Sequence, residues 1–264
     1  MSCPVALSAR ICRALAASAL LLVVLALPGK ALAANGAVAV DDTDMDPVGA
    51  CKVESWLSAA SNRDRIGLVQ TGCVFDFGRP IDLTVGVQRA RSGGEWSTGA
   101  GVKLRTLIIE GGVGRWSLLF STAAAYDFTS NDLSSFLINI PATYQPHESV
   151  KINFNLGWLY DRPNELHWAT WGAGVDWSVS NLISIIGEVY GQLGHNVVDA
   201  PHLNDPRAQL ALRFKPNENL DFDVIYGRNI TGENAHWVTV GLNVRFTGFG
   251  ERTPEARTTP LYRK

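Results

Sequence analysis

Hydrophobic and polar residues alternate along much of this chain, most strictly in residues 150–160. There every second residue is aliphatic or aromatic, and the residues between them are Lys, Asn and Gly. A turn at residues 161–164 separates this stretch from a second alternating one that ends at Trp177. Successive side chains on a strand point to opposite faces, so this hairpin has one large apolar face and one small polar face. A barrel with lipid outside and a narrow watery lumen inside has this pattern.

Comparable segments recur at intervals of about 16 residues as far as Phe246. Each is about 9–11 residues long, which is enough for a tilted strand to cross the hydrocarbon. The alternation is less regular in residues 51–76 and 115–128, so about 10 to 14 strands remain open. The sequence therefore predicts an all-β fold, an antiparallel transmembrane β-barrel of about 12 strands. The predicted strands are residues 51–60, 64–76, 81–91, 96–109, 115–128, 134–144, 150–160, 167–178, 182–193, 207–215, 220–229 and 236–246.

The predicted connections differ in length between the two ends of the barrel. Residues 76–80, 145–149 and 215–219 are short turns at one end, whereas 194–205 is the longest loop at the other. Short turns face the periplasm and longer loops face outside in barrels of this kind, which places the N-terminus in the periplasm. Aromatic residues lie near both sets of strand ends, as in the girdles found at membrane interfaces.

The first 33 residues have the pattern of a secretory signal peptide. Arg10 and Arg13 give a positively charged start, an apolar run covers residues 15–27, and Ala31-Leu32-Ala33 offers a small-residue cleavage site. The apolar run is shorter than the ~20 residues that a spanning helix needs. We therefore expect residues 1–33 to direct export and to be cleaved.

Two further segments are expected to lie outside the barrel. Residues 34–49 are small and acidic, and the run Asp41-Asp42-Thr43-Asp44-Met45-Asp46 departs from a calcium loop because Pro47 stands where Gly is required. This segment is interpreted as a solvated periplasmic tail. Residues 247–264 contain two Pro and scattered charges and are interpreted as a disordered periplasmic tail. The barrel domain is then residues 50–246.

The net charge argues against one class of partner. Removing residues 1–33 takes away three basic residues and no acidic one, which leaves 20 Lys and Arg against 25 Asp and Glu, a charge of −5. Binding of nucleic acid needs clustered positive charge, so no nucleic-acid partner is expected.

The exported chain keeps two of the four Cys residues. Cys3 and Cys12 leave with the signal peptide, whereas Cys51 and Cys73 remain in an oxidising compartment. A turn near Asn62 places Cys51 and Cys73 opposite each other on antiparallel strands, close enough to bridge. We predict a disulfide that links the first two strands; the alternative is a pair of free, small apolar residues.

The polar faces of the predicted strands carry charges of both signs. We expect Arg213 to face Asp221 across the turn near residue 217, and Arg245 to reach Glu54 where the last strand meets the first. Charged residues that line a lumen set the ion preference of a pore, or they pair with one another and plug the barrel. The mixture of signs leaves both alternatives open. The predicted lumen-lining charged residues are Asp82, Lys103, Arg105, Asp127, Lys151, Asp176, Glu188, Arg213, Asp221, Asp223 and Arg245.

Arg89 and Arg91 fall on the apolar, outward face near the outer rim. There they would contact lipid-A phosphates, or lay their stems along the apolar surface with the charged ends in water.

No catalytic site, metal site or cofactor is predicted. His167 and His236 lie at rim positions, and no Ser stands in a nucleophile-elbow context near a triad pattern. The loop that carries His195 and His202 lacks both H-E-x-x-H and paired Cys, so it does not predict a metal site.

Several stretches of the chain carry a resemblance to a known group. They are Ala50-Cys-Lys-Val-Glu-Ser-Trp56, Asn155-Leu-Gly-Trp-Leu-Tyr-Asp161, Thr170-Trp-Gly-Ala-Gly174, Val189-Tyr-Gly-Gln192 and Val240-Gly-Leu-Asn-Val-Arg-Phe246. Together they resemble Gram-negative outer-membrane β-barrel proteins of unassigned function and, more loosely, the barrels linked to the MetA pathway of phenol degradation. The similarity covers nearly all of residues 50–246. It implies a fold and an outer-membrane location, and it implies no substrate.

The last predicted strand suggests a partner. From Val238 to Phe246 it alternates and ends in an aromatic residue, which is similar to the signal that the barrel-assembly machinery recognises. It departs from that signal because residues 247–264 follow it.

The sequence favours a porin-like outer-membrane barrel that passes or binds a small solute, surrounded by outer-membrane lipid. Three alternatives remain open: a plugged structural or assembly barrel without transport, an outer-membrane lipid-modifying enzyme, and a soluble periplasmic lipocalin-like barrel with the Trp-rich face inside.

Overall fold

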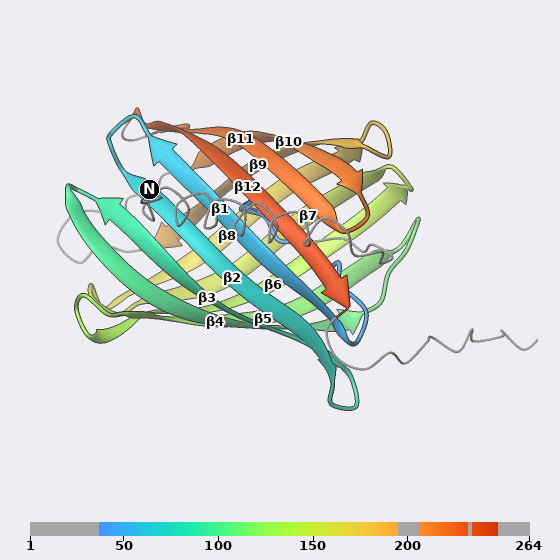
Figure 1. Cartoon of the computed structure of the whole chain (residues 1–264), viewed down its shortest axis with the longest axis horizontal. Coiled ribbons are helices and arrows are strands. Elements are labelled where there is room, and N and C mark those ends of the chain that lie inside the picture. Colours follow the sequence, from blue (N-terminus) through green and yellow to red (C-terminus); the bar gives the residue numbers. More distant parts are fainter. Residues whose placement is uncertain (1–36, 195–205, 232–233, 248–264) are drawn as a thin grey trace, which may run out of the picture. The chain divides into compact units, whose positions relative to one another are not determined.

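The computed structural model describes residues 37–194, 206–231 and 234–247. Within these ranges twelve antiparallel strands pair in chain order, and β12 pairs with β1 to close a barrel (Figure 1). The same ranges contain no helix that is long and apolar enough to cross a membrane. The strands are β1 (Ala50–Ala60), β2 (Arg65–Asp76), β3 (Pro80–Ser92), β4 (Glu95–Ile109), β5 (Trp116–Asp127), β6 (Asp132–His147), β7 (Val150–Asp161), β8 (Leu166–Ser178), β9 (Ile183–Gly194), β10 (Arg207–Asn217), β11 (Leu220–Asn229) and β12 (His236–Thr247).

The predicted all-β antiparallel barrel of about 12 strands is confirmed, with strand bounds that mostly differ by one to three residues. The irregular alternation of apolar and polar residues in 115–128 has a local cause. The pairing of β5 with β6 shifts register between Ala125 and Tyr126. In β5, Leu119 lies on the same face as Ser121, and both are fully buried, so an aliphatic residue interrupts the polar face. A strand with a bulge and an inward Leu does not alternate cleanly in sequence.

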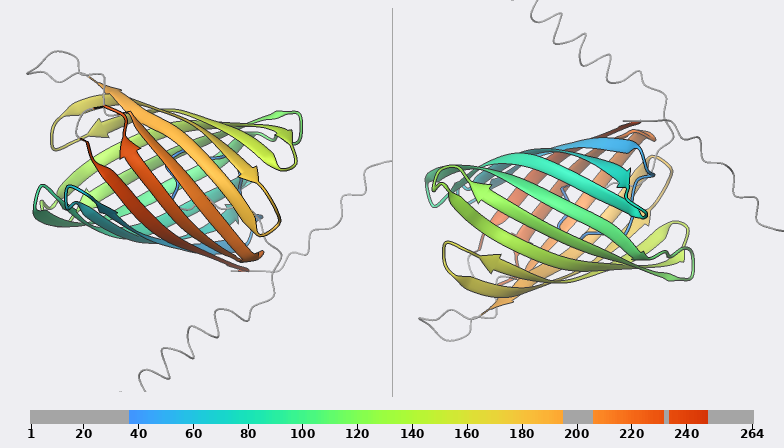
Figure 2. Two further views of the ribbon diagram at one scale, coloured as in Figure 1. Left: turned by 90° about the horizontal axis from the view of Figure 1, so that it is seen from above. Right: turned by 90° about the horizontal axis from the view of Figure 1, so that it is seen from below.

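The apolar faces of the strands form the outside of the barrel, whose strands are steeply inclined in both views of Figure 2. Phe154, Val224 and Val240 are 43%, 54% and 49% exposed, whereas Asp223 is 1% exposed. Exposed aliphatic and aromatic side chains on every second residue are suited to acyl chains rather than water. This arrangement identifies the barrel as one of the membrane-spanning type.

Aromatic side chains pack against one another near both ends of the strands. The rings of Trp116 and Tyr144 lie 5.2 Å apart at the end where β1 begins. At the opposite end, Tyr160 and His167 stack with centroids 4.9 Å apart. His167 is therefore part of an outward aromatic group at the rim, where interfaces favour amphipathic rings.

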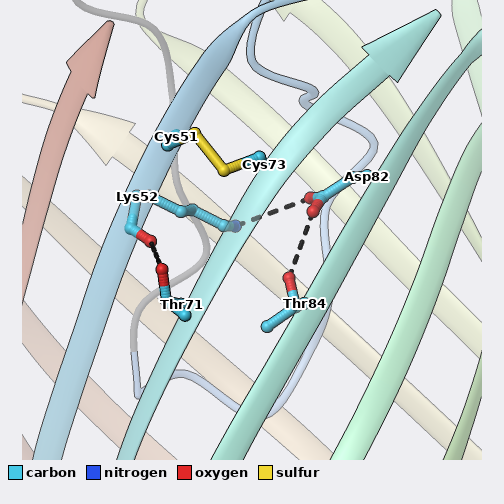
Figure 3. Close-up of a disulfide and its surroundings, with 6 residues drawn as sticks. All are labelled: Cys51, Lys52, Thr71, Cys73, Asp82 and Thr84. Atoms are coloured by element: carbon cyan, nitrogen blue, oxygen red, sulfur yellow. Dashed lines mark hydrogen bonds and ion pairs between the residues drawn. A yellow bond between two sulfur atoms is a disulfide. The ribbon is translucent and has the colours of Figure 1, made fainter. Parts of the chain in front are cut away.

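The predicted disulfide between Cys51 and Cys73 is present and links β1 to β2. The two residues are direct partners in the register of these strands. Figure 3 shows the bond beside Lys52, whose ammonium lies 3.8 Å from a carboxylate oxygen of Asp82 on β3. Thr84 donates a hydrogen bond to the same carboxylate over 3.1 Å. The disulfide thus adjoins the charged interior at the start of β1.

Residues 37–46, which we name the lumen segment, lie inside the barrel. Val40, Thr43 and Asp46 are 2%, 5% and 7% exposed, and the segment is visible between the strands in Figure 1. The interpretation of residues 34–49 as a solvated tail is therefore wrong for residues 37–46, whereas Pro47 and Val48 are exposed. Alternation cannot reveal a segment of this kind, because it is not a strand and is held by the wall around it. The predicted signal peptide, residues 34–36, the loop with His195 and His202, and residues 248–264 lie outside the described residues.

Candidate functional site

The inward faces of the strands carry the charged residues that the sequence places in the lumen. Lys103, Lys151 and Asp176 are half-buried. Asp127 lies at the end of β5, where its carboxylate accepts hydrogen bonds from the backbone N–H groups of Thr129 and Ser130 over 2.6 and 3.3 Å, so it orders a turn. The fully buried members of the predicted set are Asp82, Arg105, Glu188, Arg213, Asp221, Asp223 and Arg245.

Two arginines pair with wall carboxylates, and neither pairs as predicted. Arg213 donates from Nε and Nη2 to the carboxylate of Asp223 over 2.7 and 3.0 Å. Arg245 donates to Asp221. The prediction assumed a regular turn near residue 217. In the structure Asn217 pairs with Leu220, so the turn lies at residues 218–219. With a one-residue register shift between Phe214 and Asn217, Arg213 then faces Asp223, which leaves Asp221 for β12.

Glu54 also has partners other than the predicted Arg245. Arg245 faces Lys52 across β1 and β12, whereas Glu54 faces Asn243. The ammonium of Lys52 lies 3.4 Å from the Glu54 carboxylate, and Gln70 donates a hydrogen bond to it. The wall charges thus pair within one strand, as Lys52 and Glu54 do, or between adjacent strands, as Arg213 and Asp223 do.

Three cations on β4 and β7 bind the lumen segment. Lys103 donates to both carboxylate oxygens of Asp41 over 3.0 and 2.9 Å. Lys151 forms an ion pair with Asp44. Arg105 donates from Nη2 to the backbone carbonyls of Asp42 and Asp44, over 3.0 Å in each case. An acidic run therefore supplies the counter-charges of Lys103 and Lys151, whereas Arg105 also lies 3.5 Å from the carboxylate of Asp82 on β3.

The N-terminal half of the lumen segment is held mainly by packing and by one carboxylate. The backbone N–H groups of Ala39 and Val40 donate to Glu188 over 3.0 and 3.1 Å. Val40 fits where the wall has no side chain: a Cβ at Gly172 would stand 2.9 Å from Cγ2 of Val40, and one at Gly174 would stand 3.6 Å from its Cβ. Larger residues at these glycines would displace the segment.

A small apolar cluster inside the barrel completes this anchor. Ile186, Ala211 and Ile225 face inward and are nearly fully buried, and Ala37 and Val38 pack against them. The polar face of the wall is therefore interrupted by an aliphatic patch at the place where the segment has its apolar residues.

Two cavities border the lumen segment. One of about 410 Å³ is lined by Lys151, Lys215 and Arg245 from the wall and by Asp42 and Asp44 from the segment. The other, of about 420 Å³, is lined by wall residues of β4 and β6 to β10 and by Val38, Ala39 and Asp41. Because different residues of the segment contribute to each cavity, the segment divides the lumen between them.

Arg89 and Arg91 have protein partners near the rim. Arg89 donates to Thr98 over 2.8 Å, and its guanidinium lies 5.0 Å from the ring centroid of Trp96. Arg91 donates to the backbone carbonyls of Gly94 and Arg63, over 3.3 Å each. Contact of these arginines with lipid A stays a prediction.

Within the described ranges, no group of three His, Cys, Asp or Glu side chains is arranged to hold a metal ion.

The sequence analysis missed the lumen segment as a partner of the wall. The signal was the spacing of its acids: Asp41, Asp42, Asp44 and Asp46 fall within six residues, which end three residues before the first strand. An acidic run tethered beside a lumen that contains Lys and Arg is placed to enter it. This reading needs the three-dimensional structure, because Arg105 and Lys151 also have wall carboxylates as direct strand partners, Asp82 and Asp176, and the alternation alone does not show that the segment adds to them.

Comparison with known proteins supports the fold. A family profile described as "Uncharacterised conserved protein UCP029691" matches residues 22–246. A search of curated proteins found no match. Among solved structures, the KdgM porin in complex with disordered oligogalacturonate is similar with a TM-score of 0.58 at 12% identity, over 74% of this chain and 99% of that one. The NanC porin has a TM-score of 0.58 at 7% identity, over 73% and 98%. The COG4313 outer membrane channel from Pseudomonas putida F1 has a TM-score of 0.57 at 11% identity, over 79% of this chain and 100% of that one.

Proposed function

This chain belongs to the family of uncharacterised conserved proteins that the profile describes, and we propose that it forms a narrow outer-membrane pore or binding barrel for a small solute. The observation that carries the proposal is the divided lumen. A segment that is not part of the wall fills the middle of a polar interior and leaves a cavity of about 410 Å³ and one of about 420 Å³ beside it. A barrel with a purely structural role could fill its lumen with side chains of its own strands and would not need a separate segment inside it.

The apolar exterior and the fold support the outer-membrane location. Barrels of this architecture include porins and channels, and the KdgM porin is known in complex with disordered oligogalacturonate. We extend the same role, passage or binding of a small solute, to this chain. The partners that we propose are outer-membrane lipid around the strands and the barrel-assembly machinery at residues 238–246. Catalysis is not part of the proposal.

A second candidate, a plugged structural barrel, is favoured by the burial of the lumen segment. The two are separated by solute passage into liposomes that contain the full chain or a variant lacking residues 37–46. We expect both to pass small sugars and amino acids faster than empty liposomes, and the deletion variant to be the faster, because its lumen is continuous.

The Asp41→Asn and Asp44→Asn double variant keeps the chain length and should fall between the two forms. Heat-dependent mobility on detergent gels checks that each variant has formed a barrel. If none of the three passes or binds any solute, the pore proposal is wrong and the structural barrel stands.

A further inference from the structure

The ion pairs in the lumen fall into two groups that differ in their access to water. The wall pairs are dry: the side chains of Arg213 and Asp223 are 4% and 0% exposed. The ion pairs between wall and segment are more accessible to water: the side chains of Lys103 and Asp41 are 29% and 16% exposed. In the other pair of this group, the side chains of Lys151 and Asp44 are 25% and 22% exposed. Partly hydrated pairs contribute roughly 0–1 kcal/mol each, so another anion can replace one partner.

Each of the two hydrated lysines borders a cavity. Lys103 lines the cavity of about 420 Å³ and Lys151 lines that of about 410 Å³. A solute in either cavity therefore meets a cation whose present partner belongs to the lumen segment and not to the wall.

Arg105 is two residues from Lys103 on β4, and it binds the same segment residue, Asp44, as Lys151. Its guanidinium is buried: Nη1 donates to Asp82 of the wall over 3.5 Å, and Nη2 donates to two backbone carbonyls of the segment. Among the described residues, its Nε has no hydrogen-bond partner. A guanidinium offers a fork of donors that matches a carboxylate in a bidentate way, which is a stronger interaction than one with neutral carbonyls.

We propose that Lys103, Arg105 and Lys151 form a binding site for a small solute with two or more carboxylate groups, and that Asp41 and Asp44 occupy this site until the solute displaces them. The proposal rests on the proposed function, since it names the solute class that the lumen accepts. Asp44 follows Asp41 by three positions, so the Cα atoms that carry the carboxylates to be matched lie no more than roughly 10 Å apart.

The resident segment sets the apparent affinity of the site. A solute must compete with two tethered carboxylates, which lowers its apparent affinity by the fraction of time that the site is free. Weakening the segment without touching the wall should therefore strengthen solute binding. A site unrelated to the segment would not respond in this way.

Calorimetry with citrate as the probe tests this competition on the purified full chain in detergent. We expect the Asp41→Asn and Asp44→Asn double variant to bind citrate at least about fivefold more tightly than the unmodified protein. Adding Lys103→Gln and Lys151→Gln to that background should abolish the binding, whereas Lys103→Arg and Lys151→Arg should keep it. The matched control, Asp64→Asn with Asp132→Asn, changes one acid in the turn after β1 and one at the start of β6, and it should leave the affinity unchanged.

A second readout follows the segment itself. Val40→Cys places a thiol at a position that is 2% exposed, so citrate should accelerate its reaction with a maleimide, whereas sucrose, and chloride at the same ionic strength, should not. Chloride acting as well as citrate would mean simple screening and would overturn the proposal, as would citrate binding that survives the two Lys→Gln changes. Both measurements report binding, not passage. Citrate binding without solute passage would refute only the pore, and passage without citrate competition would refute only this site.

Discussion

At the scale of single residues, the pair of Arg213 and Asp223 shows what a buried charge requires. Each side chain is almost fully enclosed and each satisfies the other. Replacing Arg213 with Ala leaves the Asp223 carboxylate buried without its main cation, so we expect a loss of about 3–5 kcal/mol of unfolding free energy. Urea unfolding of the protein in lipid vesicles measures it.

Lys215→Ala is the matched control, because this lysine lies two residues away on β10 at the mouth of a cavity. Its effect should stay within about 0.5 kcal/mol. Converting both partners, with Arg213→Met and Asp223→Leu, should recover most of the stability, since no charge is then buried alone. A double variant as unstable as Arg213→Ala would contradict this account.

At the scale of elements, the strands could be predicted from sequence and the lumen segment could not. A strand in this barrel meets lipid on one face and the lumen on the other, so the period of two is imposed on every strand, as in β7 and β11. Residues 37–46 contact several different strands, for example Asp41 with Lys103 on β4 and Val40 with Gly172 on β8. Such contacts leave no period in the sequence.

The lumen segment also predicts a dependence on pH. Burial is the main cause that raises the pKa of Asp42 and of Asp46 to about 6, from 3.8. A carboxyl whose pKa is higher when the segment is seated favours seating below that pKa. The stabilisation is complete below pH 3.8 and is lost as the pH rises through about 6. We therefore expect the Val40→Cys thiol to react more slowly at pH 5 than at pH 7.5.

Thiol reactivity itself depends on pH, so each rate is divided by that of Ser130→Cys, a position in an exposed turn. The ratio should fall severalfold between pH 7.5 and pH 5. Introducing Asp42→Asn together with Asp46→Asn should make this ratio independent of pH. A ratio that does not change with pH in the parent protein would show that these two carboxyls do not control the segment.

At the scale of the whole molecule, the sequence predicts which residues face the interior but not how they are paired. Inward positions follow from alternation, whereas pairing depends on register. A turn centred one residue later than predicted is enough to move Arg213 from Asp221 to Asp223. Cys51 and Cys73 could be paired in advance because they share a hairpin with a regular turn. Partners brought together by barrel closure, such as β1 and β12, depend on the accumulated register of every strand between them.

Closure of the lumen by a single tethered segment leads to a prediction for the complete barrel. Val40→Cys combined with Gly174→Cys would place two Cβ atoms 3.6 Å apart, within the range of a disulfide. The bond would fix the segment in the lumen, so solute passage should fall to the level of empty liposomes and return on reduction. The unmodified protein treated with the same reductant controls for loss of the Cys51–Cys73 bond. Undiminished passage through the oxidised, cross-linked variant would mean that solutes bypass the segment, and the divided lumen would then not be the route.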